Sequence, residues 1–260
     1  MYFTEEHALF RESFKEFLQK EVVPHIDKWE ETGTIDRFIW EKFGEMGYFG
    51  LYQPEEYGGL DLDIFYTIIF LEELQKINSG GFAAAMWAHA YLAMTHLKVE
   101  GSPEIKEKYL TPSVLGEKIG CLCITEPFGG SDVAGMRSTA VLKGDHYVLN
   151  GSKTFISNGQ HADLVVLAVK TDPQARAKGV SLMLVDTHLD GFKKGTNLDK
   201  IGLHSQDTSE LFYDNVKVPK DQLLGQAGQG FAYLMQELPR ERTAIAATAI
   251  GAIRGSIDVT

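Results

Sequence analysis

Apolar residues recur at helical spacing through the first 115 residues of the chain, which predicts an all-helical N-terminal region. Thr4 can cap a first helix, and Pro24 limits it because proline lacks the backbone N–H that a helix interior requires. The predicted apolar stripe of this helix comprises Phe10, Phe14, Phe17 and Leu18.

Further helices follow in the same region. Residues 38–47 form one helical stretch, and Asp63 can cap another that runs to about Ile77, where a Ser-Gly-Gly triplet breaks it. Residues 82–97 are apolar nearly all round, which predicts a buried helix. The Ser-Pro pair at 102–103 begins the next helix, since proline is tolerated in a first turn.

From about residue 118 the pattern changes to short strands joined by turns. The strand-like runs are "KIGCLCIT", "STAVLK", "HYVLNG", "KTFISN", "DLVVLAV", "VSLMLVD" and "SELFYDNVKV". Tight turns are predicted at Gly144-Asp145, Asn150-Gly151 and Asn158-Gly159. This spacing predicts an antiparallel barrel or sandwich and not a parallel α/β sheet.

Helical character returns after the glycine-spaced "GQAGQG". Residues 230–237 form one predicted segment, and Pro239 can open another that continues through the apolar "TAIAATAIGAI". Such an apolar helix needs partners that no later residue provides. We therefore expect the chain to be a fragment that is cut inside a helix.

Together these patterns predict an α+β protein of several domains. Residues 1–115 form an N-terminal helical domain, residues 116–226 a central antiparallel β-barrel or sandwich, and residues 227–260 the truncated start of a C-terminal helical bundle. The chain has 260 residues, 44% of them hydrophobic, which suits more than one layer or domain.

The charge balance narrows the range of partners. A formal net charge of −11 argues against a nucleic acid or an anionic membrane surface, both of which require a basic face. The longest apolar stretch, 82–94, is interrupted by His89 and is too short to span a bilayer. With no secretory or transit peptide visible, we expect a cytoplasmic protein, or a mitochondrial matrix protein if a eukaryotic precursor has been processed.

Several motif-like strings lack the context that their chemistry needs. The two cysteines, Cys121 and Cys123, have neither a disulfide framework nor zinc-site spacing, so we predict buried strand thiols and no metal. "GSKT" lacks the adjacent Gly-Lys of a phosphate loop and is predicted to lie at a hairpin. Ser131 has no G-x-S-x-G frame, which disfavours a hydrolase.

The string "CITEPFGGSD" at 123–132 is different because its parts suit a ligand. A strand ends at Thr125, a proline fixes the backbone, and two glycines allow close approach to a bulky group. Backbone amides and the Ser131 hydroxyl are then donors suited to a phosphate. From the residues alone, ligand binding and a structural Gly-Gly turn are equally favoured.

The segment "CLCITEPFGGSDVAGMRSTAVLKGDHYVLNGSKTFISNG" resembles the middle-domain signature of the acyl-CoA dehydrogenase family of flavoproteins. "PEEYGGLDLD", "GSPEIKEKYL", "LHSQDTSELFYDNVKVP" and "LLGQAGQGFAYLMQELPRER" resemble other family segments in family order, so the likeness covers nearly the whole chain. The resemblance implies a cofactor, FAD, an acyl-CoA substrate, electron-transfer flavoprotein as partner, and a homodimer or homotetramer at full length.

Site residues follow from the resemblance position by position. The resemblance implies cofactor contacts for two segments, residues 122–131 and the later "TFISN". It places Thr125 beside the polar edge of the flavin, and Ser131 near both the pyrophosphate and the substrate. Many family members have Trp and Thr where this chain has Phe155 and Ser157, which retains an aromatic face and a hydroxyl. The implied cofactor residues are Leu122, Cys123, Ile124, Thr125, Gly130, Ser131, Phe155, Ile156 and Ser157.

The string "LPRER" resembles the version in isovaleryl- and long-chain acyl-CoA dehydrogenases, in which the catalytic base lies on this helix. The match assigns the base to Glu241 and a substrate-site arginine to Arg242. Helical spacing also puts Glu241 on one stripe with Leu238 and Ile245, where burial would raise its pKa. From the residues alone, an exposed acid in the first turn of a helix is equally favoured. Glu126 is expected to stabilise a turn and is assigned no catalytic step.

The resulting hypothesis is an FAD-dependent enzyme that oxidises an acyl-CoA to the trans-2-enoyl-CoA and passes electrons to electron-transfer flavoprotein. Two alternatives remain open. One is an acyl-CoA oxidase or monooxygenase of the same fold. The other is a binding module without catalytic activity, in which the truncated chain cannot hold flavin. Acyl length and branching are not predicted, because they depend on helix packing.

Overall fold

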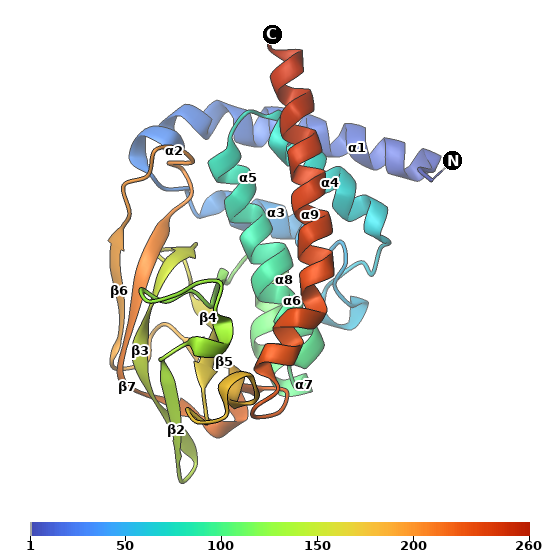
Figure 1. Cartoon of the computed structure of the whole chain (residues 1–260). Helices are drawn as coiled ribbons and strands as arrows, with labels where there is room; N and C mark the ends of the chain where they lie inside the picture. Colours follow the sequence, from blue (N-terminus) through green and yellow to red (C-terminus); the bar gives the residue numbers. More distant parts are fainter. Residues whose placement is uncertain (1) are drawn as a thin grey trace.

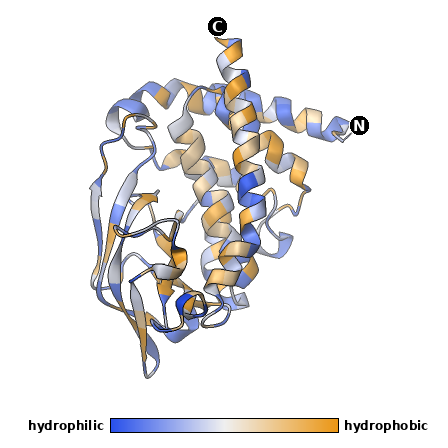
Figure 2. Ribbon diagram, viewed as in Figure 1, coloured by the Kyte–Doolittle hydropathy of each residue, from blue (hydrophilic) through white to orange (hydrophobic). Residues whose placement is uncertain are grey.

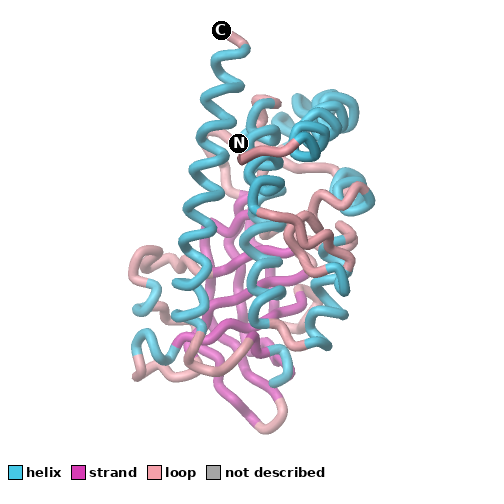
Figure 3. The backbone as a smooth tube through the Cα atoms, turned by 90° about the vertical axis from the view of Figure 1, so that its right-hand side faces the viewer, coloured by secondary structure: helices cyan, strands magenta, loops and turns pink. Residues whose placement is uncertain are grey.

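The computed structural model describes residues 2–260 of the chain. A layer of helices lies against one face of a β-sheet, and one long helix, α9, runs along the outside of that helical layer (Figures 1 and 3). This arrangement confirms the predicted helical N-terminal region, central β region and returning helix. The C-terminus lies at the free end of α9, beyond the other elements (Figure 1).

The helical layer follows the predicted caps. Thr4, Asp63, Ser79 and Ser102 each accept a backbone N–H at a helix start, so the sequence signals act as expected. The Ser-Gly-Gly triplet ends one helix, and its serine caps the next. The α-helices are α1 Glu5–Phe17, α2 Ile26–Thr32, α3 Phe38–Glu45, α4 Ile64–Lys76, α5 Gly80–Trp87, α6 Met94–Glu100, α7 Pro103–Ile105 and α8 Thr111–Val114.

Two helices continue beyond their α-helical part. After α1 the chain passes through a π-helical segment, Leu18–Val22, and a 3₁₀ turn, Val23–His25, into α2. The prediction that Pro24 ends the helical path is therefore wrong. Pro24 lies at the start of the 3₁₀ turn, where its missing N–H costs little. Likewise α5 continues through the π-helical segment Ala88–Ala93 into α6 and forms the predicted buried helix.

The β region is one mixed sheet. Its strands are β1 Gly120–Cys123, β2 Thr139–Lys143, β3 His146–Ser157, β4 Leu164–Lys170, β5 Val180–Asp186, β6 Phe192–Asn197, β7 Thr208–Pro219 and β8 Leu223–Leu224, in the order β6-β7-β3-β2-β4-β5-β8 with β1 beside β4. The antiparallel prediction is wrong for β1 and β2, which both pair with β4 in parallel. The β2–β3 hairpin separates β1 from β4 along the chain, so the two strands can run in the same direction.

One predicted turn is also wrong. "HYVLNG" and "KTFISN" belong to a single strand, β3, which runs through Asn150-Gly151. Gly151 has a φ of +149°, and the register against β7 shifts between Leu149 and Gly151, where Asn150 lies opposite two residues of β7, Asp214 and Asn215. The extra residue makes a bulge in β7, and β3 continues through Asn150-Gly151. "GSKT" accordingly lies within β3 and not at a hairpin. The predicted two-residue turn at Gly144-Asp145 joins β2 to β3, as expected.

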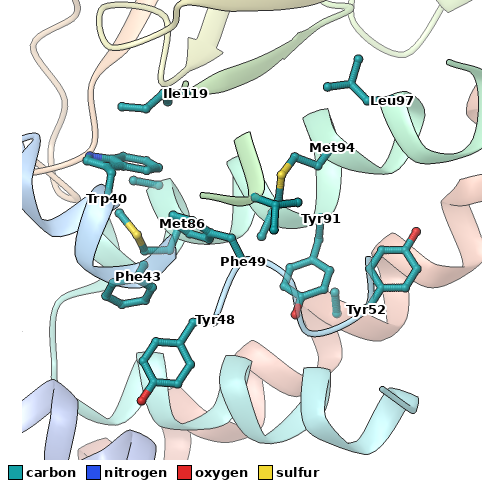
Figure 4. Close-up of a cluster of buried hydrophobic side chains, with 14 of the residues drawn as sticks. Trp40, Phe43, Tyr48, Phe49, Tyr52, Met86, Tyr91, Met94, Leu97 and Ile119 are labelled. Carbon is teal, nitrogen blue, oxygen red and sulfur yellow. The ribbon is translucent and has the colours of Figure 1, made fainter. Parts of the chain in front are cut away.

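The sheet separates two apolar cores. Along β4, Leu164 and Val166 pack with the helical layer, whereas Val165 and Leu167 pack in a second core on the far side. Burial on both faces explains why this strand reads as a continuous apolar run. The helix through α5 and α6 is apolar along nearly its whole length (Figure 2). Aromatic and Met side chains from α3, α5 and the segment around Phe49 fill the first core (Figure 4).

The last helix, α9, is a single helix of 29 residues from Gly230 to Asp258, although two segments were predicted. Pro239 lies inside it. Both Pro239 and Met235 are exposed, so water can satisfy the Met235 carbonyl that loses its N–H partner. The helix packs along α4, and its buried face carries small residues: Ala244, Ala247, Gly251 and Gly255.

Substitution of Gly251 by alanine is expected to weaken this packing. The added Cβ would lie 2.5 Å from the backbone oxygen of Glu72, so the two helices would have to move apart. We expect a loss of about 1–3 kcal/mol in the free energy of unfolding, measured by urea denaturation. Ala246→Leu, on the exposed side of α9, is the control and should change little. An unchanged midpoint for Gly251→Ala would contradict this packing.

Candidate functional site

A cavity of about 240 Å³ lies where the helical layer meets the ends of β1 and β3. Six of the predicted cofactor residues and the predicted base line it together: Leu122, Ile124, Thr125, Phe155, Ile156, Ser157 and Glu241. These residues come from three segments that are far apart in the sequence. The fold therefore brings the "CITEPFGGSD" string, the "TFISN" string and the "LPRER" helix to one space.

The alternation of β1 divides the predicted residues between two faces. Leu122 and Ile124 line the cavity. Cys123 points to the far side of the sheet, where its Sγ lies 3.8 Å from that of Cys121 in the second core. Both thiols are buried and free, as predicted. On the cavity side, Cys123 can therefore contact a ligand only through its backbone atoms.

Phe155 reaches the cavity through an irregularity in β3. The register of β3 against β7 shifts between Lys153 and Ile156, and Phe155 has a φ of +58°. The Thr154 amide donates instead to the carbonyl of Thr125, 3.0 Å away, which joins the two cavity strings. A non-glycine residue in this conformation is strained. The conformation leaves Phe155 67% exposed while it lines the cavity.

A buried ion pair supports the wall beneath these residues. Lys153 Nζ lies 2.9 Å from Glu126 Oε1 and also donates to the carbonyl of Ile124 at 3.0 Å. The Glu126 carboxylate accepts two backbone amides as well, from Arg137 at 2.6 Å and Ser138 at 3.0 Å. Burial alone would raise the pKa of Glu126, but Lys153 and these donors hold it below its ordinary value. All of its bonds are structural, in keeping with the role expected from the sequence.

The glycine loop after Thr125 lies open to solvent. The amides of Glu126 and Gly129 donate to each other's carbonyls at 3.1 Å, so neither is free for a phosphate as the sequence suggested. A Cβ at Gly129 would meet nothing within 4 Å, and one at Gly130 would make only ordinary contact with Thr125, 3.5 Å away. Gly130 and Ser131 are exposed, and neither lines the cavity. Within residues 2–260, no neighbouring atom requires glycine at these two positions.

Glu241 lies in the middle of α9, since that helix begins at Gly230. The alternative of an exposed first-turn acid is therefore wrong. The side chain is half-buried at the cavity, and burial raises its pKa, while the charge of His96 lowers it and that of Glu237 raises it. A carboxyl with a raised pKa in a cleft is suited to accept a proton near neutral pH.

Two other predictions on α9, for Arg242 and for Ile245, differ from the structure. Arg242 is exposed and does not line the cavity, so this residue and its neighbour Glu241 do not face the same space. Ile245 is 51% exposed, which contradicts the predicted buried stripe through Leu238, Glu241 and Ile245. The buried face of the helix lies on the small residues that pack against α4 instead, because they permit close approach.

The residues of one wall of the cavity were not predicted from the sequence. Trp87, Ala88 and Leu92, from α5 and its π-helical continuation, complete the lining. The indole Nε1 of Trp87 is buried without a hydrogen-bond partner among the residues that the structure describes. A tryptophan among small residues in "FAAAMWAHA" was the available signal. Within residues 2–260, no cluster of three or more His, Cys, Asp or Glu side chains suits a metal ion, and none of the helices has the length and apolarity needed to cross a bilayer.

Comparison with known proteins decides the family. The model "Acyl-CoA dehydrogenase, N-terminal domain" matches residues 4–117, and "Acyl-CoA dehydrogenase, middle domain" matches residues 121–216. The chain belongs to the acyl-CoA dehydrogenase family. The family resemblance read from the sequence is thereby confirmed.

Individual family members give the same result. The mitochondrial long-chain specific acyl-CoA dehydrogenase of Mus musculus is 42% identical over 96% of this chain, and the mitochondrial isovaleryl-CoA dehydrogenase of Arabidopsis thaliana is 36% identical over 98%. This chain spans 58% of the length of the mouse protein and 63% of the plant protein.

Solved structures of acyl-CoA dehydrogenases share the fold. The enzyme from Geobacillus kaustophilus superposes with a TM-score of 0.93 at 44% identity, over 98% of this chain and 67% of its own. A Bacillus anthracis acyl-CoA dehydrogenase, solved in complex with FAD, superposes with a TM-score of 0.90 at 30% identity, over 96% of this chain and 42% of its own.

Proposed function

We propose that the whole protein catalyses the FAD-dependent α,β-dehydrogenation of an acyl-CoA thioester to the trans-2-enoyl-CoA, with Glu241 as the base. One observation carries the proposal: the half-buried Glu241 carboxyl lines the same cavity as Thr125, Phe155 and Ser157. A base and a candidate flavin surface must share one space, because the reaction removes an α-proton and a β-hydride from adjacent carbons.

The residues of the cavity fit a flavin ring system. Phe155 is an exposed aromatic residue, and Thr125 and Ser157 offer hydroxyls. The Trp87 indole N–H is buried with no partner in the described part of the chain. At about 240 Å³ the space suits a ring system rather than a whole dinucleotide. The exposed Gly130 and Ser131 would hold the remainder of FAD outside the cavity. Bound FAD would supply the acceptor for the hydride.

Glu241 would hold the proton. Its ionised form accepts the α-proton of the thioester, and burial of the carboxyl favours the neutral form that results. Leu122 and Leu92 give the cavity apolar walls that exclude water from the carboxylate. Ser131 and Arg242 are proposed to contact the substrate outside the cavity, in keeping with their exposure. We further propose electron-transfer flavoprotein as electron acceptor and a homodimer or homotetramer as the assembly.

The test is flavin reduction by substrate. The whole protein, purified with FAD, should lose its flavin absorbance when a saturated acyl-CoA is added without oxygen, and a panel of chain lengths should define the preferred acyl group. Peroxide release under air would indicate an oxidase instead. A protein that binds FAD but is not bleached by any acyl-CoA of the panel would refute the proposed reaction.

A further inference from the structure

The helical wall of the cavity is hydrogen-bonded to both strand segments that line the cavity with it. Trp87 and Ala88 line the cavity where α5 passes into its π-helical continuation. The next residue, His89, bonds to the start of β1. One turn earlier, the carbonyl of Ala85 accepts a bond from Asn158, which follows β3. The two bonds therefore flank the cavity-lining residues of this helix, one toward each strand.

His89 holds β1 through one of its ring nitrogens. The residue is 0% exposed, and its Nδ1 lies 3.0 Å from the amide of Gly120, two residues before Leu122 of the cavity. Because an amide N–H can only donate, Nδ1 accepts, and Nε2 carries the hydrogen that it donates to the Ser113 carbonyl at 3.0 Å. Burial lowers the pKa of His89 to about 4, so the ring is neutral near pH 7 and keeps these two roles. Helix and strand are also in close contact here, since a Cβ at Gly120 would lie 2.9 Å from that of Ala93.

Asn158 makes the second connection, at the end of β3. It is 0% exposed and has a φ of +63°, a left-handed conformation that asparagine adopts more readily than most residues. Its Nδ2 donates to the Ala85 carbonyl at 2.8 Å, and its backbone amide donates to the carbonyl of Asp207 at 3.1 Å. In the chain it follows directly after Ser157, which lines the cavity. Asn158 therefore joins the end of β3 to the same helix that His89 joins to β1.

We propose that His89 and Asn158 are positioning residues that set the width of the cavity between its helical wall and its strand wall. Neither residue lines the cavity, so each acts through the backbone that it holds: His89 through β1, and Asn158 through α5 and the end of β3. The consequence for flavin binding rests on the proposed function, whereas the joining of the two walls does not. Without either bond the walls should shift, and a ring system held between them should bind less tightly.

Two substitutions of His89 separate its two bonds. Asparagine places its oxygen near the position of Nδ1 and can still accept from Gly120, whereas glutamine places its amide near Nε2 and can still donate to Ser113. Each variant loses one buried hydrogen bond, so urea denaturation should show similar stability for both. In the whole protein, the Kd of FAD, measured by quenching of FAD fluorescence, should nevertheless be about 5–10-fold higher for His89→Gln than for His89→Asn. Equal affinities, or weaker binding by His89→Asn, would overturn the role of His89.

Asn158→Gly removes the second connection but keeps the backbone, because glycine also adopts the left-handed conformation. It should raise the Kd of FAD about 5–10-fold. Asn215→Gly is the matched control: Asn215 has a φ of +54° but is exposed, and its side chain bonds to Asn150 and Asp214, neither of which lines the cavity. Its affinity for FAD should not change. The same Kd for both variants would contradict the role of Asn158.

Hydrogen exchange tests the joining of the walls without flavin. The Gly120 amide loses its acceptor in His89→Gln and keeps one in His89→Asn, so it should exchange faster in the first variant. Mass spectrometry of peptides that span residues 118–123 measures the difference. If the whole protein binds no FAD, the proposed function fails, and this exchange still decides whether His89 holds β1. Equal exchange in the two variants would show that it does not.

Discussion

Glu241→Gln is expected to leave FAD bound and to slow the bleaching of the flavin by acyl-CoA by about 10³-fold or more. Glutamine keeps the shape of the side chain at the cavity but cannot accept the α-proton. The raised pKa of Glu241 predicts a second signature: the acidic limb of kcat/KM in the unmodified protein lies above the ordinary carboxyl value of about 4.3. Rapid mixing under anaerobic conditions measures the bleaching rate, and steady-state assays measure the limb.

Glu237→Gln is the matched control, since Glu237 lies one turn earlier on the same helix and does not line the cavity. It should retain flavin reduction, and because it removes a charge that raises the pKa of Glu241, its acidic limb should move to lower pH. Bleaching at the unmodified rate in Glu241→Gln would remove this residue from the mechanism, even if the protein still proved to be a dehydrogenase.

The sequence predicted those parts of the fold that local chemistry decides. Thr4 and Asp63 are hydroxyl and carboxyl caps, and each needs only its own first turn to act. The strand predicted to end at Thr125 corresponds to β1, which ends two residues earlier, at Cys123; it was recognisable because its apolar run is short and followed by turn residues. For the site, the motif strings predicted most residues that line the cavity. Each string could be recognised by itself, and the fold then places the three strings next to one another.

Features that depend on distant partners were not predictable. Asn150-Gly151 is typical of a tight turn, and only the pairing of β7 along the whole of β3 shows that the strand continues through it. Ile245 was expected inside because it is apolar, whereas Gly251 packs inside because α4 lies so close that a larger side chain would collide with its backbone. Trp87 became a cavity residue only through the meeting of its helix with β1 and β3.

The position of Glu241 links these two kinds of information. The resemblance selected the residue, but the half-burial that raises its pKa follows from its place at the cavity on α9, a helix that also packs on α4 through small residues. Gly251 stands ten residues from Glu241 on the same helix and fixes how near the helix lies. If α9 moves away from α4, the Glu241 carboxyl should become more exposed, and its pKa should fall towards the ordinary value.

Lys153→Met is expected to lower the free energy of unfolding by about 3–5 kcal/mol, the largest effect on stability that we predict. Lys153 is 0% exposed, and its ammonium group neutralises the Glu126 carboxylate 2.9 Å away inside the sheet. Methionine fills a similar volume but leaves a buried carboxylate without its counter-ion. The Ile124 carbonyl also loses a donor, so the cavity wall should loosen and FAD should be retained less well. Urea denaturation and flavin content after gel filtration measure the two effects.

Removing both charges separates the ion pair from the space it occupies. The double variant Glu126→Gln with Lys153→Met has no unpaired charge, and the glutamine oxygen can still accept one of the two amides, of Arg137 and Ser138, that now bond to separate carboxylate oxygens. It should regain part of the stability lost in Lys153→Met, because the largest penalty comes from the stranded carboxylate and not from the missing attraction. If the double variant is as unstable as the single one, Lys153 acts through its packing and its bond to Ile124 instead.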